Sequence, residues 1–286
     1  MARLQDFETT ATFTGTVLKN ERITDVTSDE DVREIELEID KKDFTYEIGQ
    51  SVAVFVPGPH DFGNAQHMRL YTIAEDGTSP NGKTTVTVCV KRCFYIDEFS
   101  GERYPGRASN YLCDRQLGDA ITLAGPYPAP FSPPEDETAP ILMVGLGTGI
   151  APFRVFVKHI YGARGGWKGK VRLFYGAKTG LEMLYMNDKK NDFAHYYDEE
   201  TFKAFEAVSP RPAFEAPAAI DRAIEDNAIE VWEMMCHPET HVYVAGQEQV
   251  GELLDQAGAS VAGSKEKWER RKAELKAGGR WHELLY

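Results

Sequence analysis

Residues 144–152 read VGLGTGIAP, a glycine-rich turn that joins an apolar run, residues 141–144, to a helical pattern. Apolar side chains at Ile150, Phe153 and Val157 give that pattern its helical spacing. Glycines at such a turn let the backbone approach a phosphate group, and the N-terminus of the following helix supplies free N–H groups. The stretch therefore predicts a strand-to-helix crossover with a phosphate-binding turn.

The chain after this turn alternates strands and helices. Compact β-type runs at residues 171–175, 204–208 and 241–245 are separated by long helical patterns. Such alternation is typical of a doubly wound α/β domain, whose parallel strands hold nucleotides at their carboxyl ends. We therefore expect a nucleotide-binding α/β domain with a parallel sheet over residues 137–286.

The chain before the turn has a different period. Short alternating runs are separated by turn formers such as Asp76-Gly77 and Asn81-Gly82, and these runs are residues 12–18, 33–39, 51–56, 84–90 and 120–123. Short strands at this spacing predict an antiparallel β-barrel domain, residues 1–136. A proline-rich, acidic stretch, residues 127–140, breaks every period and is expected to be a linker or exposed loop.

The composition predicts a globular chain of two domains. Its 286 residues exceed what one core usually organises. Asp and Glu number 45 against 32 Lys and Arg, so the formal net charge is −13 and we expect no nucleic-acid binding. The longest apolar runs are too short to span a bilayer and the first residues lack a signal-peptide pattern, so the cytoplasm is the expected location.

The four cysteines, Cys89, Cys93, Cys113 and Cys236, form no CxxC pair and lack the clustered spacing of zinc or iron–sulfur ligands. We therefore expect no metal site and four reduced, largely buried thiols. Any one-electron carrier that works with this chain must then be a separate protein.

Further motifs stand on both sides of the glycine-rich turn. Those before it are Arg69-Leu70-Tyr71-Thr72, Cys89-Val90-Lys91-Arg92 with Tyr95, and Arg107-Ala108-Ser109. Those after it are Gly176-Ala177-Lys178-Thr179, Ser209 with Arg211, Gly246-Gln247 and the terminal Tyr286. With these motifs in this order, the chain resembles the plant-type ferredoxin–NADP+ reductase family over nearly its whole length.

The resemblance implies that the barrel domain binds FAD. Arg69 would meet the flavin pyrophosphate, Tyr71 would pack on the isoalloxazine, and Tyr95 would stack on the adenine. Lys91 would lie between the flavin and the nicotinamide nucleotide. The implied FAD-binding residues are Arg69, Leu70, Tyr71, Thr72, Cys89, Val90, Lys91, Tyr95, Arg107, Ala108, Ser109 and Tyr286. Ala108 replaces a cysteine of the family, a change that a backbone N–H contact would survive.

The resemblance also implies that the α/β domain binds NADP. The implied residues are Gly147, Thr148, Gly149, Ala177, Lys178, Ser209, Arg211, Gly246 and Gln247. Ser209 would bind the adenosine 2′-phosphate. Thr72 and Tyr286 are the implied catalytic residues, because the hydroxyl of Thr72 would lie near the flavin N5 and the ring of Tyr286 would cover the flavin until nicotinamide displaces it.

Three positions depart from the family pattern. Ala245 replaces a cysteine beside the nicotinamide, and Leu284 replaces a glutamate. Glu283 is one position earlier, which in an extended strand is the opposite face. Pro210 replaces the arginine that follows the 2′-phosphate serine, and Arg211 comes one step later. NADP is therefore the expected nucleotide and NAD remains an alternative.

The resemblance implies an FAD-dependent oxidoreductase that exchanges electrons between NADP(H) and a one-electron carrier, ferredoxin or flavodoxin. Two alternatives stay open: an NAD(P)H-dependent reductase component of an oxygenase system, of the aromatic acyl-CoA epoxidase type, and a non-turnover flavin-binding redox subunit. Because ferredoxins are commonly acidic, the acidic chain needs a basic patch for docking. The candidates are Lys41-Lys42, Lys91-Arg92, and Arg103 or Arg107.

Overall fold

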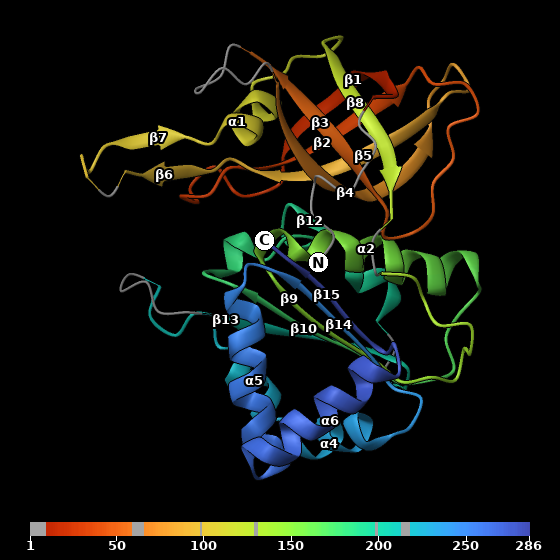
Figure 1. Ribbon diagram of the computed structural model, residues 1–286, viewed down its shortest axis with the longest axis vertical. Helices are drawn as coiled ribbons and strands as arrows, with labels where there is room; N and C mark the ends of the chain where they lie inside the picture. The colour runs from red at the N-terminus through yellow and green to blue at the C-terminus, as the bar shows by residue number, and fades with distance from the viewer. Residues whose placement is uncertain (1–9, 59–65, 98, 129–130, 198–199, 213–217) are drawn as a thin grey trace. The chain divides into compact units, whose positions relative to one another are not determined.

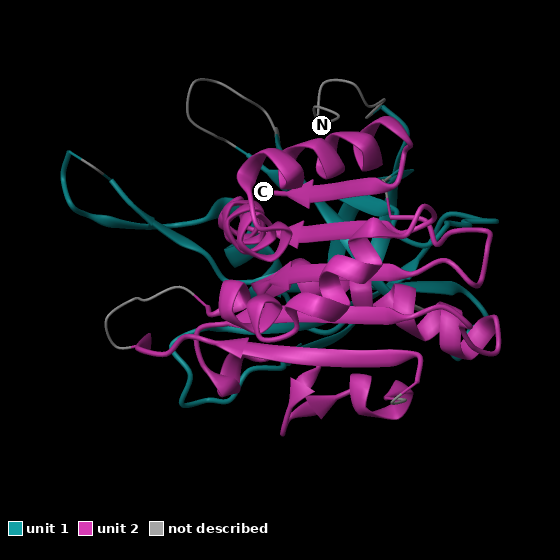
Figure 2. Cartoon of the chain, turned by 90° about the horizontal axis from the view of Figure 1, so that it is seen from below, with its two compact units in different colours: residues 1–129 teal, residues 130–286 magenta. Residues whose placement is uncertain are grey.

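The computed structural model of the chain describes residues 10–58, 66–97, 99–128, 131–197, 200–212 and 218–286. The chain divides into two compact units, residues 1–129 and 130–286, each with its own sheet and core (Figure 2). The expected division between residues 136 and 137 falls inside the second unit.

A closed antiparallel barrel forms the first unit, with the strand order β1-β2-β5-β4-β3-β8 (Figure 1). The strands are β1 (Thr12–Arg22), β2 (Val32–Ile39), β3 (Ser51–Pro57), β4 (Gln66–Thr78), β5 (Thr84–Lys91) and β8 (Ala120–Tyr127). Alternate side chains, such as Val17, Ile35, Leu37 and Val88, are buried inside it. This interior fixes the register, because a slip of one residue would turn the apolar face outward. The barrel prediction is confirmed.

Strand β4 passes through a position where the sequence predicts a turn. Asp76 and Gly77 both lie inside β4 and pair with β5, so that prediction is wrong. The register shifts between Ile73 and Glu75, where a β-bulge absorbs the irregularity. A Cβ on Gly77 would lie 2.7 Å from Thr85 Oγ1, so this glycine serves close cross-strand packing.

A separate hairpin and a short helix complete the first unit. The hairpin strands are β6 (Phe94–Ile96) and β7 (Arg103–Pro105), and helix α1 (Arg107–Cys113) follows them. The turn of the hairpin is held by Asp97 Oδ1, which accepts hydrogen bonds from the N–H groups of Ser100 at 2.7 Å and Phe99 at 3.1 Å. Hydrogen bonding, chiefly from Ser100, lowers the pKa of Asp97. Strands of three residues give no periodic signal, so the sequence does not predict this hairpin.

A five-stranded parallel sheet forms the second unit, with the order β13-β10-β9-β14-β15. The strands are β9 (Ile141–Leu146), β10 (Val171–Ala177), β13 (Phe202–Val208), β14 (His241–Gly246) and β15 (Trp281–Leu285). The chain moves from β9 outward to β13 and then returns to β14 on the other side of β9. Ligands of such sheets bind where the strand order reverses. The predicted doubly wound α/β domain is confirmed.

Helices cover both faces of this sheet. Helix α2 (Ile150–Lys158) covers the face of the sheet that carries Tyr243, and its Phe153 and Phe156 point toward that face. The ring centroid of Phe156 lies 5.0 Å from that of Tyr243. Leu142, Val144 and other residues of the opposite face pack on α3 (Ile220–Glu225), α4 (Ala228–Cys236), α5 (Gln249–Ala262) and α6 (Lys265–Ala277). A small two-stranded sheet pairs β11 (Met186–Asn187) with β12 (Lys190–Asn191). Among the described residues, no helix is long and apolar enough to cross a membrane.

The proline-rich stretch before β9 is only partly exposed. The Phe131 side chain is fully buried, with its ring centroid 5.4 Å from that of Tyr243 and 5.7 Å from that of Phe153. Tyr243 Oη donates a hydrogen bond to the carbonyl of Ser132 at 2.7 Å. The two units divide within this stretch, as a linker would, but the expectation of an exposed loop is wrong around Phe131, because this aromatic side chain of a polar stretch packs into the core.

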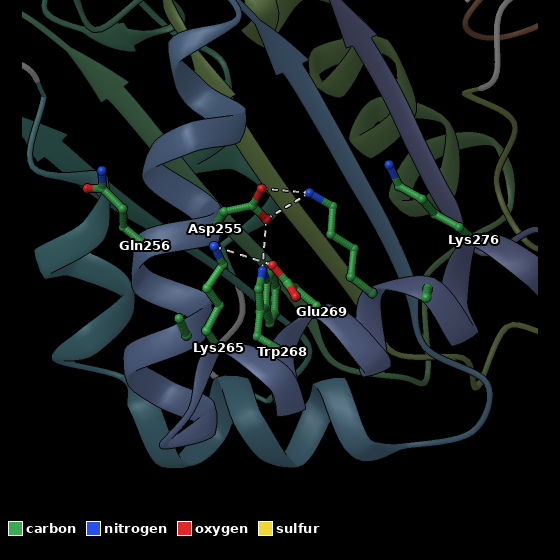
Figure 3. A pocket seen from close by; sticks show the side chains of 9 residues that line it. Asp255, Gln256, Lys265, Trp268, Glu269 and Lys276 are labelled. Carbon is green, nitrogen blue, oxygen red and sulfur yellow. Dashed lines mark hydrogen bonds and ion pairs between the residues drawn. The ribbon is translucent and has the colours of Figure 1, made fainter.

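Helix α6 is rich in charged residues and is fixed to α5 by Trp268. The indole Nε1 donates a hydrogen bond to Asp255 Oδ1 at 2.8 Å, and Lys272 Nζ lies 2.7 Å from the same oxygen (Figure 3). A Cβ on Gly258 would lie 2.4 Å from the indole, so this glycine makes room for it. A groove of about 620 Å³ beside these residues is lined by side chains of α5 and α6, and none of the predicted site residues lines it.

All four cysteines are free thiols. Cys89 and Cys113 are buried, as expected, and burial raises the pKa of Cys113 to about 12. Cys93 and Cys236 are exposed, so the expectation of largely buried thiols is wrong for these two. Cys93 is exposed because it follows β5, outside the barrel interior.

Two histidines make this sheet sensitive to acid. His241 Nδ1 on β14 lies 3.3 Å from His282 Nε2 on β15, and the His282 ring stacks on Tyr243. Burial, and then the neighbouring His241, lower the pKa of His282 to about 4, and burial also lowers the pKa of His241. The folded protein therefore binds these protons less readily than the unfolded chain does.

We expect this pair to stabilise the fold fully above the ordinary histidine pKa of about 6.5 and to lose its contribution as the pH falls toward 4. His282→Gln should make the free energy of unfolding less dependent on pH in that window. Urea unfolding at a series of pH values measures this dependence. His195→Gln, at an exposed position, is the control, and equal pH dependence in both variants would contradict the prediction.

Candidate active site

Strand β4 carries four of the residues that the sequence implicates in flavin binding, Arg69, Leu70, Tyr71 and Thr72. Tyr71 packs against the barrel core, and burial raises its pKa, with a smaller contribution from the nearby Cys93 thiol. The ring is therefore neutral and offers an aromatic face for stacking. Thr72 Oγ1 accepts a hydrogen bond from Ser51 Oγ at 3.5 Å. Arg69 is exposed and its Nη1 donates to the carbonyl of Met68 at 2.9 Å, which leaves the guanidinium on the surface for an anion.

Strand β5 carries Cys89, Val90 and Lys91, helix α1 begins with Arg107, Ala108 and Ser109, and Tyr95 lies on β6. Helix α1 packs against both β4 and β5. The side chains of Cys89 and Val90 are buried, so only their backbone could meet a ligand. Ser109 Oγ accepts a hydrogen bond from Cys93 N at 3.1 Å and donates to the carbonyl of Gly106 at 3.3 Å. Ser109 therefore fixes α1 to the segment after β5, and its neighbours Arg107 and Ala108 begin the same helix.

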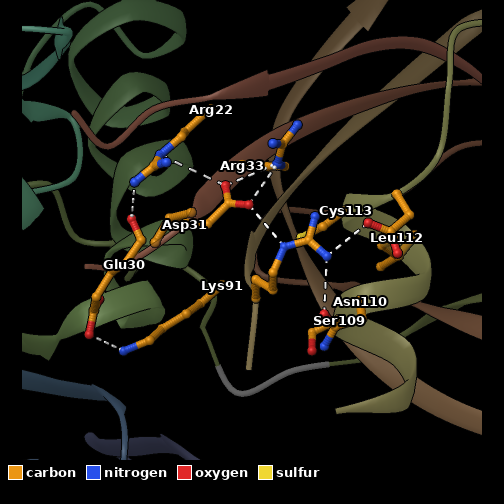
Figure 4. A network of polar contacts seen from close by, with 12 residues as sticks. Arg22, Glu30, Asp31, Arg33, Lys91, Ser109, Asn110, Leu112 and Cys113 are labelled. Carbon is orange, nitrogen blue, oxygen red and sulfur yellow. Dashed lines mark hydrogen bonds and ion pairs between the residues drawn. The ribbon is translucent and has the colours of Figure 1, made fainter. Parts of the chain in front are cut away.

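Lys91 and Arg92 are both paired with acidic residues. Lys91 Nζ contacts the carboxylate of Glu30, and Arg92 donates to Asp31 Oδ2 at 2.9 Å and to Asp114 Oδ1 at 2.8 Å (Figure 4). Although burial opposes the effect, hydrogen bonds led by Arg92 lower the pKa of Asp31. These carboxylates offset the charge of Lys91 and Arg92, so the pair supplies little of the basic patch for which it was a candidate.

Glu30 and Asp31 are neighbours of Lys91 and Arg92 that the sequence does not reveal. They lie in the loop between β1 and β2, far along the chain from Lys91. The loop is held in place because the carbonyl of Glu30 accepts hydrogen bonds from Arg22 Nη2 at 3.0 Å and Thr24 Oγ1 at 2.6 Å. A pair of acidic loop residues has no periodicity that would indicate which strand it meets.

In the second unit, the carboxyl ends of the parallel strands gather the residues implicated in nucleotide binding. Strand β9 is followed by Gly147, Thr148 and Gly149, and β13 is followed by Ser209 and Arg211. Ala177 ends β10 and Lys178 follows it, while Gly246 ends β14 and Gln247 follows it. The register places Ala177 opposite Val208, and Gly145 opposite Ala245. The structure thus places these motifs at one edge of the sheet.

The turn after β9 is a 3-10 turn, η3 (Gly147–Gly149), in which two glycines serve different purposes. Gly147 has a φ of 57° and no atom within 4 Å of an added Cβ, so its backbone is open to a ligand. A Cβ on Gly149 would lie 2.2 Å from the carbonyl oxygen of Ala245. Gly147 therefore allows approach and Gly149 allows close packing, an arrangement that fits a nucleotide phosphate at this turn.

The implied NADP-binding residues after β10 and β13 divide into a buried one and exposed ones. Ser209 is 5% exposed and its Oγ accepts a hydrogen bond from Arg211 N at 3.3 Å. Lys178 and Arg211 are exposed. Residues 213–217, which follow, lie outside the described residues. Two exposed cations near the carboxyl ends of adjacent strands are suited to an anionic group.

Tyr286 is held beside the nucleotide turn. Its hydroxyl shares a hydrogen bond with that of Thr148, and its backbone N–H donates to the carbonyl of Gly246 at 3.1 Å. The side chain is 60% exposed. An aromatic ring is therefore presented to solvent next to η3, the position at which a nucleotide would bind.

Two of the three departures from the family pattern form one contact. Ala245 on β14 is paired with Leu284 on β15, so the positions of the family's cysteine and glutamate are apolar neighbours. Glu283 does not replace the missing carboxylate. Its Oε1 accepts a hydrogen bond from Trp281 Nε1 at 2.6 Å and lies 3.2 Å from Lys276 Nζ of α6. Glu283 therefore ties β15 to a helix on the opposite face from Leu284.

We expect Glu283→Gln to leave the rate of flavin reduction by NADPH unchanged. The same change removes a partly exposed ion pair, so we expect a loss of about 0.5–1 kcal/mol in the free energy of unfolding. Stopped-flow absorbance and urea unfolding measure the two effects. A matched variant, Lys276→Gln, should cost similar stability, and a large loss of reduction rate in Glu283→Gln alone would contradict the assignment.

Comparison with known proteins agrees with this geometry. Residues 18–129 match the family described as Oxidoreductase FAD-binding domain, and residues 143–255 match the family described as Oxidoreductase NAD-binding domain. The ferredoxin–NADP reductase of Picosynechococcus sp. is 30% identical over 283 residues, which cover 96% of this chain and 70% of that protein. The chloroplastic ferredoxin–NADP reductase of Spinacia oleracea is 32% identical over 250 residues, covering 84% and 66% respectively.

A solved structure shares the fold. The ferredoxin–NADP+ reductase of Plasmodium falciparum matches with a TM-score of 0.68 and 17% identity, covering 98% of each chain. A barrel with an FAD-binding family match, followed by a parallel sheet with an NAD-binding family match, defines a two-domain flavin- and nicotinamide-dependent oxidoreductase. Identity along almost the whole chain narrows the assignment, and the chain belongs to the ferredoxin–NADP reductase family.

Proposed function

We propose that this protein exchanges electrons between NADP(H) and ferredoxin through bound FAD. The observation that carries the proposal is the edge of the parallel sheet, where the open turn at Gly147, the exposed Lys178 and the Thr148-bound ring of Tyr286 lie together. The relatives described above support ferredoxin and NADP(H) as the two partners, since both relatives are named ferredoxin–NADP reductase.

The barrel unit carries the residues that would bind FAD, and the sheet unit carries those that would bind the nicotinamide nucleotide. Bound FAD would supply the exchange between two-electron hydride transfer and one-electron transfer. In the barrel, Arg69 would neutralise the pyrophosphate, Tyr71 would offer its face to the flavin, and Thr72, bonded to Ser51, would hold its hydroxyl toward the ring. In the sheet unit, Lys178 and Arg211 would bind nucleotide phosphates, and Tyr286 would exclude water until nicotinamide takes its place.

Anaerobic stopped-flow reduction of the purified holoprotein tests the proposal. We expect NADPH to reduce the bound flavin and the reduced protein to pass electrons to ferredoxin. A flavin that stays oxidised for minutes with both NADPH and NADH would refute turnover and favour the non-turnover flavin-binding subunit. Failure of the apoprotein to bind FAD would refute the flavoenzyme altogether.

The same experiment addresses the remaining alternatives. NADPH and NADH are compared at equal concentration, and we expect NADPH to react faster because Lys178 and Arg211 can contact an extra phosphate. Faster reaction with NADH would assign NAD instead. Flavodoxin is the second carrier to compare with ferredoxin. An oxygenase component as partner is not favoured, since relatives that match 96% of this chain are named ferredoxin–NADP reductase.

A further inference from the structure

The β6–β7 hairpin presents large apolar side chains to solvent. Five exposed ones lie in it, namely Phe94, Tyr95, Ile96, Phe99 and Tyr104. Tyr95 is 56% exposed and Tyr104 is 38% exposed. An aromatic pair exposed on one face of such a hairpin is suited to binding a flat ligand.

The two tyrosines form one face of the hairpin. Tyr95 on β6 is directly opposite Tyr104 on β7, and their rings are stacked with centroids 5.5 Å apart and planes inclined by 22°. Successive side chains of a strand alternate between faces, so Phe94 and Arg103 belong to the other face. There the Arg103 guanidinium lies 3.8 Å from the centroid of the Phe94 ring. The tyrosine face is therefore a distinct aromatic surface.

Tyr104 is itself held in place. Its hydroxyl donates a hydrogen bond to Glu102 Oε2 at 2.5 Å, and this bond raises the pKa of Tyr104. A centroid separation of 5.5 Å leaves no room for a third ring between the tyrosines, because three stacked rings need about 7 Å between the outer two. Tyr104 therefore supports one side of the Tyr95 ring and leaves the remainder of that exposed ring for a ligand.

The base of the hairpin is anchored to the barrel. Asn110 Nδ2 donates to the carbonyls of Cys93 and Gly106, each at 2.8 Å, and these two residues flank the hairpin. Asn110 Oδ1 accepts from Arg92 Nη1 at 3.0 Å, and Arg92 is bound in turn to Asp31 (Figure 4). The aromatic face is thus fixed relative to the strands that carry the other FAD-binding residues.

We propose that Tyr104 is a positioning residue for FAD, and that it backs Tyr95 so that the adenine stacks on an aromatic surface already in place. The inference rests on the proposed function, because it takes FAD as the ligand of this unit. Stacking of a base on an aromatic ring is favourable, and a ring that is already ordered loses less rotamer freedom on binding. FMN lacks the adenine, so Tyr104 should discriminate FAD from FMN.

The test is the affinity of the apoprotein, prepared from the holoprotein by flavin removal, for FAD and for FMN. We expect Tyr95→Ala to weaken FAD binding by about 10- to 100-fold. Tyr104→Ala should weaken it by about 3- to 10-fold, and Tyr104→Phe, which keeps the ring, should restore most of the affinity. FMN affinity should be unchanged in all three. Phe99→Ala, at the fully exposed position in the hairpin turn, is the matched control and should bind FAD normally.

A double variant separates positioning from direct contact. If Tyr104 acts through Tyr95, Tyr104→Ala should cause no further loss of FAD affinity in the Tyr95→Ala background. An additive loss, an unchanged FAD affinity in Tyr104→Ala, or an equal loss of FMN affinity would each overturn the inference. If the wild type binds FAD and Tyr104→Ala binds it equally well, only the inference about Tyr104 is rejected. If the wild type binds no FAD, the proposed function is rejected.

Discussion

Gly149→Ala is expected to destabilise the second unit by about 3 kcal/mol. The added Cβ would lie 2.2 Å from the carbonyl oxygen of Ala245 and 2.6 Å from the nitrogen of Gly246. Both atoms belong to the backbone of β14, which is paired on both sides within the sheet, so they cannot move aside as a flexible side chain could. The clash should therefore be relieved only by displacing η3 from the sheet.

Gly147→Ala provides the comparison two residues earlier. Its Cβ would meet no atom within 4 Å, but the φ of 57° is unfavourable for alanine and should cost about 1 kcal/mol. We expect this variant to stay folded and to lose NADPH affinity, because the methyl group occupies the open side of the turn. Urea unfolding and nucleotide titration of the holoproteins measure both effects. Equal destabilisation by the two variants would contradict the different roles assigned to the glycines.

Arg69→Ala is expected to weaken FAD binding by about 100-fold, equivalent to about 3 kcal/mol. An exposed guanidinium on β4 can make two charge-assisted hydrogen bonds to a pyrophosphate, and alanine makes none. The present contact of Arg69, with the carbonyl of Met68, is a neutral backbone bond and is easily exchanged. The dissociation constant of FAD from the apoprotein is the quantity to measure.

Arg115→Ala is the control for the loss of one positive charge in the same unit. Arg115 stacks on Tyr111 with its guanidinium carbon 4.5 Å from the ring centroid and pairs with Asp119, so it is already engaged within the protein. We expect normal FAD affinity in this variant. A similar loss in both variants would show that general charge, rather than contact by Arg69, determines binding.

The sequence predicts both sheets because their periods differ. The barrel strands alternate, as at Val17 and Ile35, since one face of each strand meets the core. The parallel strands are apolar throughout, as in β9, since helices cover both faces. Predictions from local sequence fail where a residue type is present for a reason other than the one that it usually indicates. Gly77 signals a turn but packs across strands, and Phe131 lies in a polar stretch but enters the core.

The candidate site is predictable where a motif follows a strand, because the carboxyl ends of parallel strands meet at one edge. This rule places Thr148, Lys178 and Arg211 together. Contacts between distant loops have no such rule. Glu30 contacts Lys91, and Tyr104 contacts Tyr95, but the residues next to each of them in the sequence do not predict these contacts. These two contacts are therefore visible only in the folded chain.

The burial of Phe131 has a consequence for limited proteolysis. A protease that cuts between residues 133 and 137 would leave Phe131 and the carbonyl of Ser132 on the N-terminal fragment, although both serve the core around Tyr243. The two fragments should therefore remain associated through the buried Phe131 side chain. Separating them should leave a cavity between Tyr243 of the sheet and Phe153 of α2. Independent expression of the second unit should accordingly begin before Phe131.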